Sequence, residues 1–140
     1  MNTRLSRNVV LFIAWTFGIL VPLYSVSRSL PAGRSAFDWV FQTDASHVLM
    51  HTFLYAVLAG LLVPILRVFM LSTGRMIACA LATVAVVAVS QEGIQMLCEH
   101  IALGSDEIFD FFVDLNAGML GIMTQIRVSR RRTEQNGSMP

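Results

Sequence analysis

Four long apolar segments dominate the sequence, at about residues 9–27, 48–71, 76–98 and 108–126. A helix needs roughly 20 mostly apolar residues to cross the hydrocarbon core of a bilayer, and each segment comes close to that length. The composition agrees, because 14% of the residues are charged, whereas about a quarter are charged in an ordinary soluble domain. The sequence therefore predicts an all-α polytopic membrane bundle of four transmembrane helices, as a single domain over residues 1–132.

Arginines mark one end of each predicted helix. Arg4 and Arg7 precede the first segment, Arg67 and Arg75 border the turn between the second and third, and Arg127 with residues 130–132 follows the fourth. Because arginines near helix ends favour the cytoplasmic side, we expect both termini inside. The polar residues 133–140 are then predicted to form a disordered cytoplasmic tail.

The N-terminal part of the chain leaves two points open. Its basic start, apolar run and Ser25-Val26-Ser27 triplet are also typical of a cleaved signal peptide, although the run is slightly longer than the usual core of about 7–15 residues. Residues 28–46, which include Trp39, fit either an amphipathic segment on the outer interface or an ordinary loop.

The net charge bears on nucleic-acid binding, and the spacing of the two cysteines bears on a disulfide. A formal net charge of +1 and the lack of a basic face with interleaved aromatics give no indication of nucleic-acid binding. Cys79 and Cys98 belong to one predicted helix and lie about 28 Å apart along it. That separation is far beyond the reach of a disulfide.

Polar side chains occur inside three of the apolar segments: His51 and Tyr55, Glu92 and Gln95, Asp110 and Asp114. Each pair is spaced three or four residues apart, so its members share one face of a helix. Ionisable groups at membrane depth are costly unless they face a partner or water, which makes them candidates for a functional site. With the predicted topology all six side chains lie in the outer half of the bundle, and we interpret them as a binding site.

Small residues continue the face of the two aspartates. Ala117, Gly118 and Gly121 follow at helical spacing. Such residues let transmembrane helices approach closely. The sequence predicts a tight helix contact there.

The same polar residues carry a resemblance to a known family. His51, Phe53 and Tyr55 resemble the first signature of the VanZ-like family, and Glu92 with Gln95 is similar to its Glu-x-x-Gln motif. The segment from Asp110 to Gly121 resembles the family's Asp-x3-Asn-x2-Gly-x3-Gly pattern, with Asp114 at the place of the Asn and Ala117 at that of the first Gly. The resemblance covers roughly residues 44–125.

The resemblance implies a multi-pass protein of the bacterial inner membrane, with a role in the cell envelope or in antibiotic resistance. It implies contact with membrane lipids and with a lipid-linked or lipopeptide ligand, and it supplies no reaction. The aspartate at position 114 makes this cluster more acidic than the family pattern. Oligomeric state is left open.

Three interpretations of the polar residues compete. They form hydrogen bonds that hold a purely structural bundle together, they bind the polar head of an amphiphile, or they belong to a metal-assisted hydrolase or transferase acting on a lipid-linked substrate. The carboxyl groups at similar depth, among them Glu92, Asp110 and Asp114, exceed what packing requires, so we favour the binding site. Proton transport is a weaker alternative, because no internal repeat is visible.

A metal or other cofactor is not expected from the sequence. His47 and His51 are spaced to hold one metal ion together, but His47 has no evident partner beyond Asp44 to orient its ring. We therefore predict that His47 is a solvated interfacial residue. His51 is expected to pair with Glu92 or Asp110 in a hydrogen-bonded network.

Overall fold

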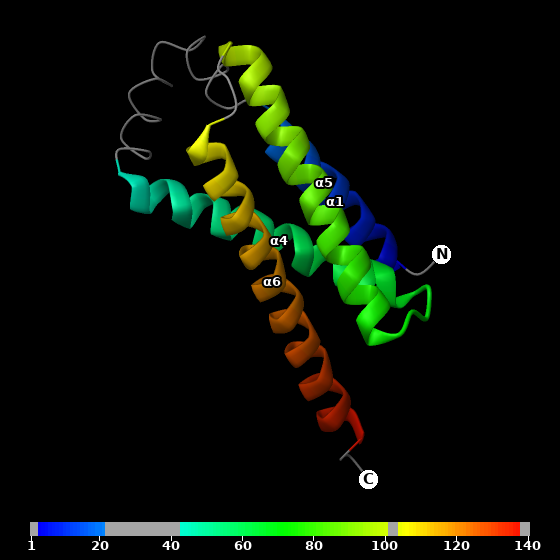
Figure 1. Ribbon diagram of the computed structural model, residues 1–140. Helices are drawn as coiled ribbons and strands as arrows, with labels where there is room; N and C mark the ends of the chain where they lie inside the picture. The colour runs from blue at the N-terminus through cyan, green and yellow to red at the C-terminus, as the bar shows by residue number, and fades with distance from the viewer. Residues whose placement is uncertain (1–2, 22–42, 101–103, 138–140) are drawn as a thin grey trace.

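The computed structural model describes residues 3–21, 43–100 and 104–137. These residues form four helices and no strand: α1 (Thr3–Leu20), α4 (Asp44–Arg67), α5 (Thr73–Glu99) and α6 (Ser105–Gly137). In Figure 1, α6 passes in front of α4 and crosses it steeply, and α1 lies behind α5. The all-α prediction is confirmed for the described part of the chain.

The ends of the helices differ from the predicted ends for local reasons. α4 begins at Asp44 rather than near residue 48, because the Thr43 side chain accepts a hydrogen bond from the Ser46 backbone N–H and completes a capping box. α1 ends at Leu20, two residues before Pro22, since the residue preceding a proline disfavours helical geometry.

The C-terminal ends of α5 and α6 lie at Glu99 and Gly137. α5 is closed by His100, which has a left-handed backbone with φ of 56° and whose backbone N–H bonds to the Met96 carbonyl. α6 continues through Gly137, so residues 133–137 are helical where the sequence predicts a disordered tail. Trp39 and the Ser25 to Ser27 triplet lie outside the described residues.

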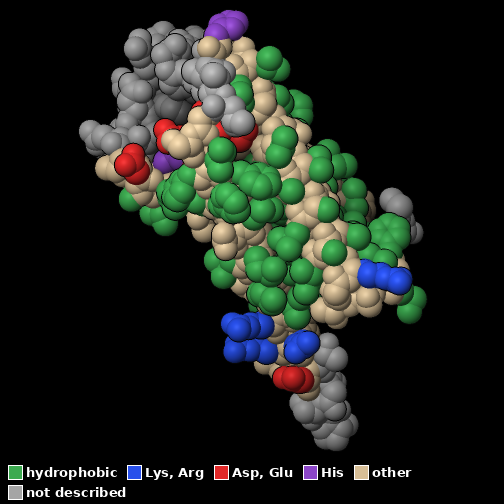
Figure 2. Space-filling view, viewed as in Figure 1, with side chains coloured by type: hydrophobic (Ala, Val, Ile, Leu, Met, Phe, Trp, Pro, Cys, Tyr) green, Lys and Arg blue, Asp and Glu red, His purple; other side chains and the backbone are tan. Residues whose placement is uncertain are grey.

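Two helices are long and apolar enough to cross a membrane: Asp44–Arg67 and Thr73–Cys98. The apolar stretch of α1, Leu5–Leu20, is shorter, and Asp110 and Asp114 interrupt that of α6. Large apolar side chains are nevertheless exposed on all four helices, among them Phe17, Leu49, Phe53, Val86, Leu97, Phe109, Phe112 and Leu120. Figure 2 shows apolar side chains covering the middle of the visible face. A surface of this kind is typical of contact with lipid or with a protein partner.

α4 and α6 come into close backbone contact at Gly121. A Cβ atom added at Gly121 would lie 2.8 Å from the carbonyl carbon of Ala56 and 2.9 Å from its Cα, so only glycine fits there. One turn earlier, a Cβ at Gly118 would lie 3.0 Å from both Val84 methyl groups on α5. The predicted close approach at the small residues of α6 is thus confirmed.

α1 is attached to α4 beside the polar residues. The Trp15 indole Nε1 donates a hydrogen bond to the Leu54 carbonyl at 2.9 Å, and its ring meets Phe53 edge-on at 5.8 Å between centroids. The core between the helices is apolar, with Leu58, Val63, Val84 and Ile122 fully buried. The polar residues described next are the exception within this interior.

Candidate functional site

Two histidine–aspartate pairs join α4 to α6, one helical turn apart. We call His47 and Asp110 the outer pair, in which His47 Nε2 lies 3.0 Å from Asp110 Oδ2. We call His51 and Asp114 the inner pair, in which His51 Nδ1 lies 2.8 Å from Asp114 Oδ1. The two pairs are four residues apart on α4 and also four residues apart on α6. Although the two helices cross, both therefore pass from the outer pair to the inner pair in the direction from N-terminus to C-terminus.

The two pairs differ strongly in exposure. The side chains of the outer pair are 39% exposed for His47 and 14% for Asp110. Those of the inner pair are 8% exposed for His51 and 0% for Asp114. The two imidazole rings stack with centroids 4.5 Å apart, so the pairs form one continuous polar column. The column runs from the surface into the interior.

These contacts correct two predictions from the sequence. His47 is not a solvated residue without an orienting partner, because it bonds to Asp110. The partner of His51 is Asp114 rather than Glu92 or Asp110. The sequence gives the depth of each residue along its own helix, but the pairing depends on how α4 and α6 are offset, and α4 begins one turn earlier than expected.

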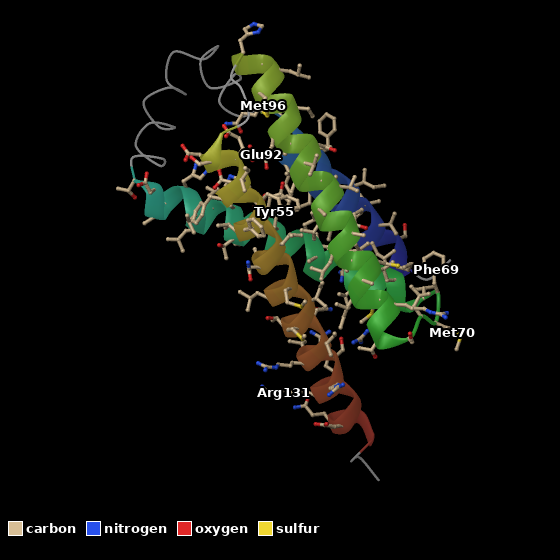
Figure 3. The ribbon with its side chains drawn as sticks, in the orientation of Figure 1. Tyr55, Phe69, Met70, Glu92, Met96 and Arg131 are labelled. Carbon is tan, nitrogen blue, oxygen red and sulfur yellow. The ribbon has the colours of Figure 1, made fainter. Side chains whose placement is uncertain are left out.

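α5 contributes the third side of the site. Glu92 is buried, and its Oε1 accepts a hydrogen bond from Gln91 Nε2 at 3.4 Å. The Tyr55 hydroxyl donates to Gln91 Oε1 at 2.8 Å. Figure 3 shows Tyr55 and Glu92 where α4, α5 and α6 meet, with Arg131 far along α6. We call His51, Glu92 and Asp114 the inner cluster.

Gln91 is a site residue that the sequence analysis missed. Its position directly before Glu92 could have indicated that it belongs to the site. The family resemblance instead pointed to Gln95 as the amide of the site. Gln95 is half-buried on α5, and within the described ranges no hydrogen bond connects it to the inner cluster. The other five predicted residues come together: His51, Tyr55, Glu92, Asp110 and Asp114.

One oxygen of the site is left without a partner. Asp114 Oδ2 is buried and accepts no hydrogen bond from any described residue. A buried polar atom without a hydrogen bond costs about 1–3 kcal/mol, and more when the group is charged. The fold therefore keeps an acceptor inside the bundle that its own described side chains do not satisfy.

Two overlapping groups of side chains have the spacing needed to hold a metal ion. They are His47, His51 and Asp110, and the inner cluster of His51, Glu92 and Asp114. In each group one potential ligand atom from each residue lies within 4.8 Å of the others. All three members of the second group are buried.

Comparison with known protein families, with characterised proteins and with solved structures finds no match for this chain. The family resemblance therefore rests on the motif residues themselves.

Proposed function

We propose that this chain is a VanZ-like multi-pass protein of the bacterial inner membrane that binds the polar head of a lipid-linked or lipopeptide envelope molecule. In this proposal all four helices lie in the membrane, with α1 and α6 joining α4 and α5, and both termini are cytoplasmic. The binding site opens from the outer half of the bundle and contains His51, Tyr55, Glu92, Asp110 and Asp114.

The distribution of side chains supports the membrane part of the proposal. Large apolar residues are exposed along the helices, whereas the inner cluster is buried between them. By chain position, Arg67 and Arg127 lie about 24 Å and 20 Å along their helices from His51 and Asp114. Figure 2 shows the arginines of α6 below the apolar zone and acidic side chains at its other end.

The unsatisfied Asp114 oxygen carries the binding part of the proposal. A bundle held together only by hydrogen bonds has no need for a fully buried carboxylate that lacks a partner on one oxygen. A ligand head with hydroxyl, amide or amine groups supplies the missing donor. Its acyl chain would lie along exposed apolar residues of α4 and α6 such as Phe53 and Phe112. Few convergent polar groups within apolar walls are typical of sites for amphiphiles.

The binding proposal is tested with a fluorescent N-acyl peptide and protein in lipid nanodiscs. We expect saturable binding by the wild type and at least about tenfold weaker binding by Glu92→Gln, which is the effect of losing one charge-assisted hydrogen bond. Glu107→Gln is the matched control, since Glu107 lies on the same side of the fold and bonds only to the Gly104 N–H among described residues. Equal binding by all three proteins would place the ligand away from Glu92, and no saturable binding by the wild type would favour the purely structural bundle.

The topology is tested by labelling single cysteines in intact cells with a membrane-impermeant reagent. The free Cys79 and Cys98 are exposed and are first replaced by serine. We expect labelling of Ser105→Cys, at the start of α6, and no labelling of Glu134→Cys near its end until the cells are opened. The reverse pattern would mean that the protein has the opposite orientation in the membrane, with the site on the cytoplasmic side.

A further inference from the structure

We propose that the inner cluster is a binding site for one divalent transition-metal ion, with His51, Glu92 and Asp114 as the protein ligands. The inference goes beyond the proposed function, because it assigns Asp114 Oδ2 to an ion rather than to a donor group of the ligand head. Titration with the metal alone, without an amphiphile, separates the two. It also departs from the sequence-based expectation that no metal is bound. That expectation rested on His47, which is not one of these ligands.

The chemistry of the three side chains fits such an ion. One imidazole nitrogen and carboxylate oxygens from two further helices form a mixed set that suits zinc, iron or manganese. An imidazole ligand argues against magnesium or calcium, which prefer oxygen ligands only. Three protein ligands with a further position open is the arrangement of reactive zinc sites.

A divalent ion would balance the charge of the ionised cluster. When both buried carboxyl groups are ionised, their negative charge exceeds what one imidazole can neutralise, and none of the described arginines is paired with them. Buried charges are costly unless they are paired or coordinate a metal. A divalent cation with a neutral imidazole makes the cluster neutral, and it gives the unpartnered Asp114 Oδ2 a positive neighbour.

The distances are compatible with this arrangement. The closest two potential ligand atoms, His51 Nδ1 and Asp114 Oδ1, lie 2.8 Å apart, and no pair in the cluster exceeds 4.8 Å. Ligand bonds of about 2.0–2.2 Å place the ligands of a tetrahedral ion roughly 3.4 Å apart. The 2.8 Å pair of His51 and Asp114 therefore has to open slightly when an ion binds, and any pair wider than about 3.4 Å has to close.

The outer group of His47, His51 and Asp110 is the weaker candidate. His47 is partly exposed, whereas all three members of the inner cluster are buried. The rings of His47 and His51 stack face to face, whereas a shared ion must lie near the plane of each ring, in the direction of a nitrogen lone pair. Asp114 Oδ2, the buried oxygen without a hydrogen-bond partner among the described residues, belongs to the inner cluster and not to the outer group.

Cobalt provides the direct test, because Co²⁺ replaces zinc and its visible absorption reports ligand geometry. The full-length protein in detergent is stripped of metal and titrated with Co²⁺ alone. We expect about one equivalent bound per chain, as in a dedicated site. Glu92→Gln and Asp114→Asn should each weaken binding more than about 100-fold, since even changes next to a metal ligand cost 10–100-fold.

His47→Ala is the matched control, because it removes the imidazole of the outer pair and leaves all three ligands of the inner cluster in place. It should bind Co²⁺ within about threefold of the wild type, a change of less than about 0.7 kcal/mol. Loss of binding in His47→Ala but not in Glu92→Gln would assign the ion to the outer group and overturn the proposal. So would wild-type protein that binds no Co²⁺. Circular dichroism and gel filtration confirm that each variant is folded, and a variant that fails either is replaced by Glu92→Ala.

Discussion

The outer and inner pairs contain the same two residue types, on the same two helices, with similar hydrogen-bond lengths of 3.0 Å and 2.8 Å. They differ in burial and in their neighbours. The outer pair lies near the surface, where an ion pair contributes about 0–1 kcal/mol. The inner pair is close to Glu92 on α5. Its Asp114 Oδ2 has no hydrogen-bond partner among the described residues. The difference between the pairs shows that α5, which carries Glu92, creates the candidate site, and not the histidine–aspartate pair alone.

The largest effect is expected where both pairs are lost together. Gly121→Ala places a Cβ against the Ala56 backbone, which forces α4 and α6 apart and should cost about 3 kcal/mol of unfolding free energy. Gly60→Ala is the matched control, since a Cβ there meets nothing within 4 Å. Unfolding in mixed detergent micelles measures both. Equal stabilities would show that the close helix contact does not hold the two pairs in register.

The second-largest effect is a difference in unfolding free energy between variants of the inner pair and of the outer pair. Asp114→Ala leaves His51 buried without its partner and should lower the unfolding free energy by about 2 kcal/mol. Asp110→Ala removes the equivalent partner from a half-exposed histidine and should cost less than about 1 kcal/mol. The same unfolding assay compares them. If the two variants lose the same stability, burial does not distinguish the inner pair from the outer one.

The smallest effect concerns the α5 side of the inner cluster. Tyr55→Phe removes the hydroxyl that donates to Gln91 and should cost about 1 kcal/mol. The double variant Tyr55→Phe with Gln91→Leu should lose little more, because both changes act on one hydrogen bond. Additive losses would mean that Tyr55 and Gln91 stabilise the protein independently.

The sequence predicted the parts of this site that depend on one helix at a time. Spacing alone placed His51 with Tyr55 on one face of α4, and Asp110 with Asp114 on one face of α6. Gly121 could be recognised as a close-contact residue because glycine within an apolar helix has few other roles. The extent of α4 was predicted to within about one turn.

The features that were missed depend on how two helices are offset. The partner of His51, the bonded state of His47 and the choice of Gln91 over Gln95 all follow from the rotation and depth of one helix against another. A single sequence carries no direct record of either quantity. The start of α4 was also missed, because the capping box at Thr43 lies outside the apolar segment.

The imidazole ¹⁵N spectrum of histidine-labelled protein in lipid nanodiscs, before and after one equivalent of Zn²⁺, tests most directly whether the inner cluster is the ligand site. His47→Ala and His51→Ala spectra assign the resonances, and the exposed His100 provides an internal reference. We expect the His51 resonances to shift on adding Zn²⁺ while those of His47 and His100 stay in place. A shift confined to His47, or no shift at His51, would contradict the proposed set of ligands.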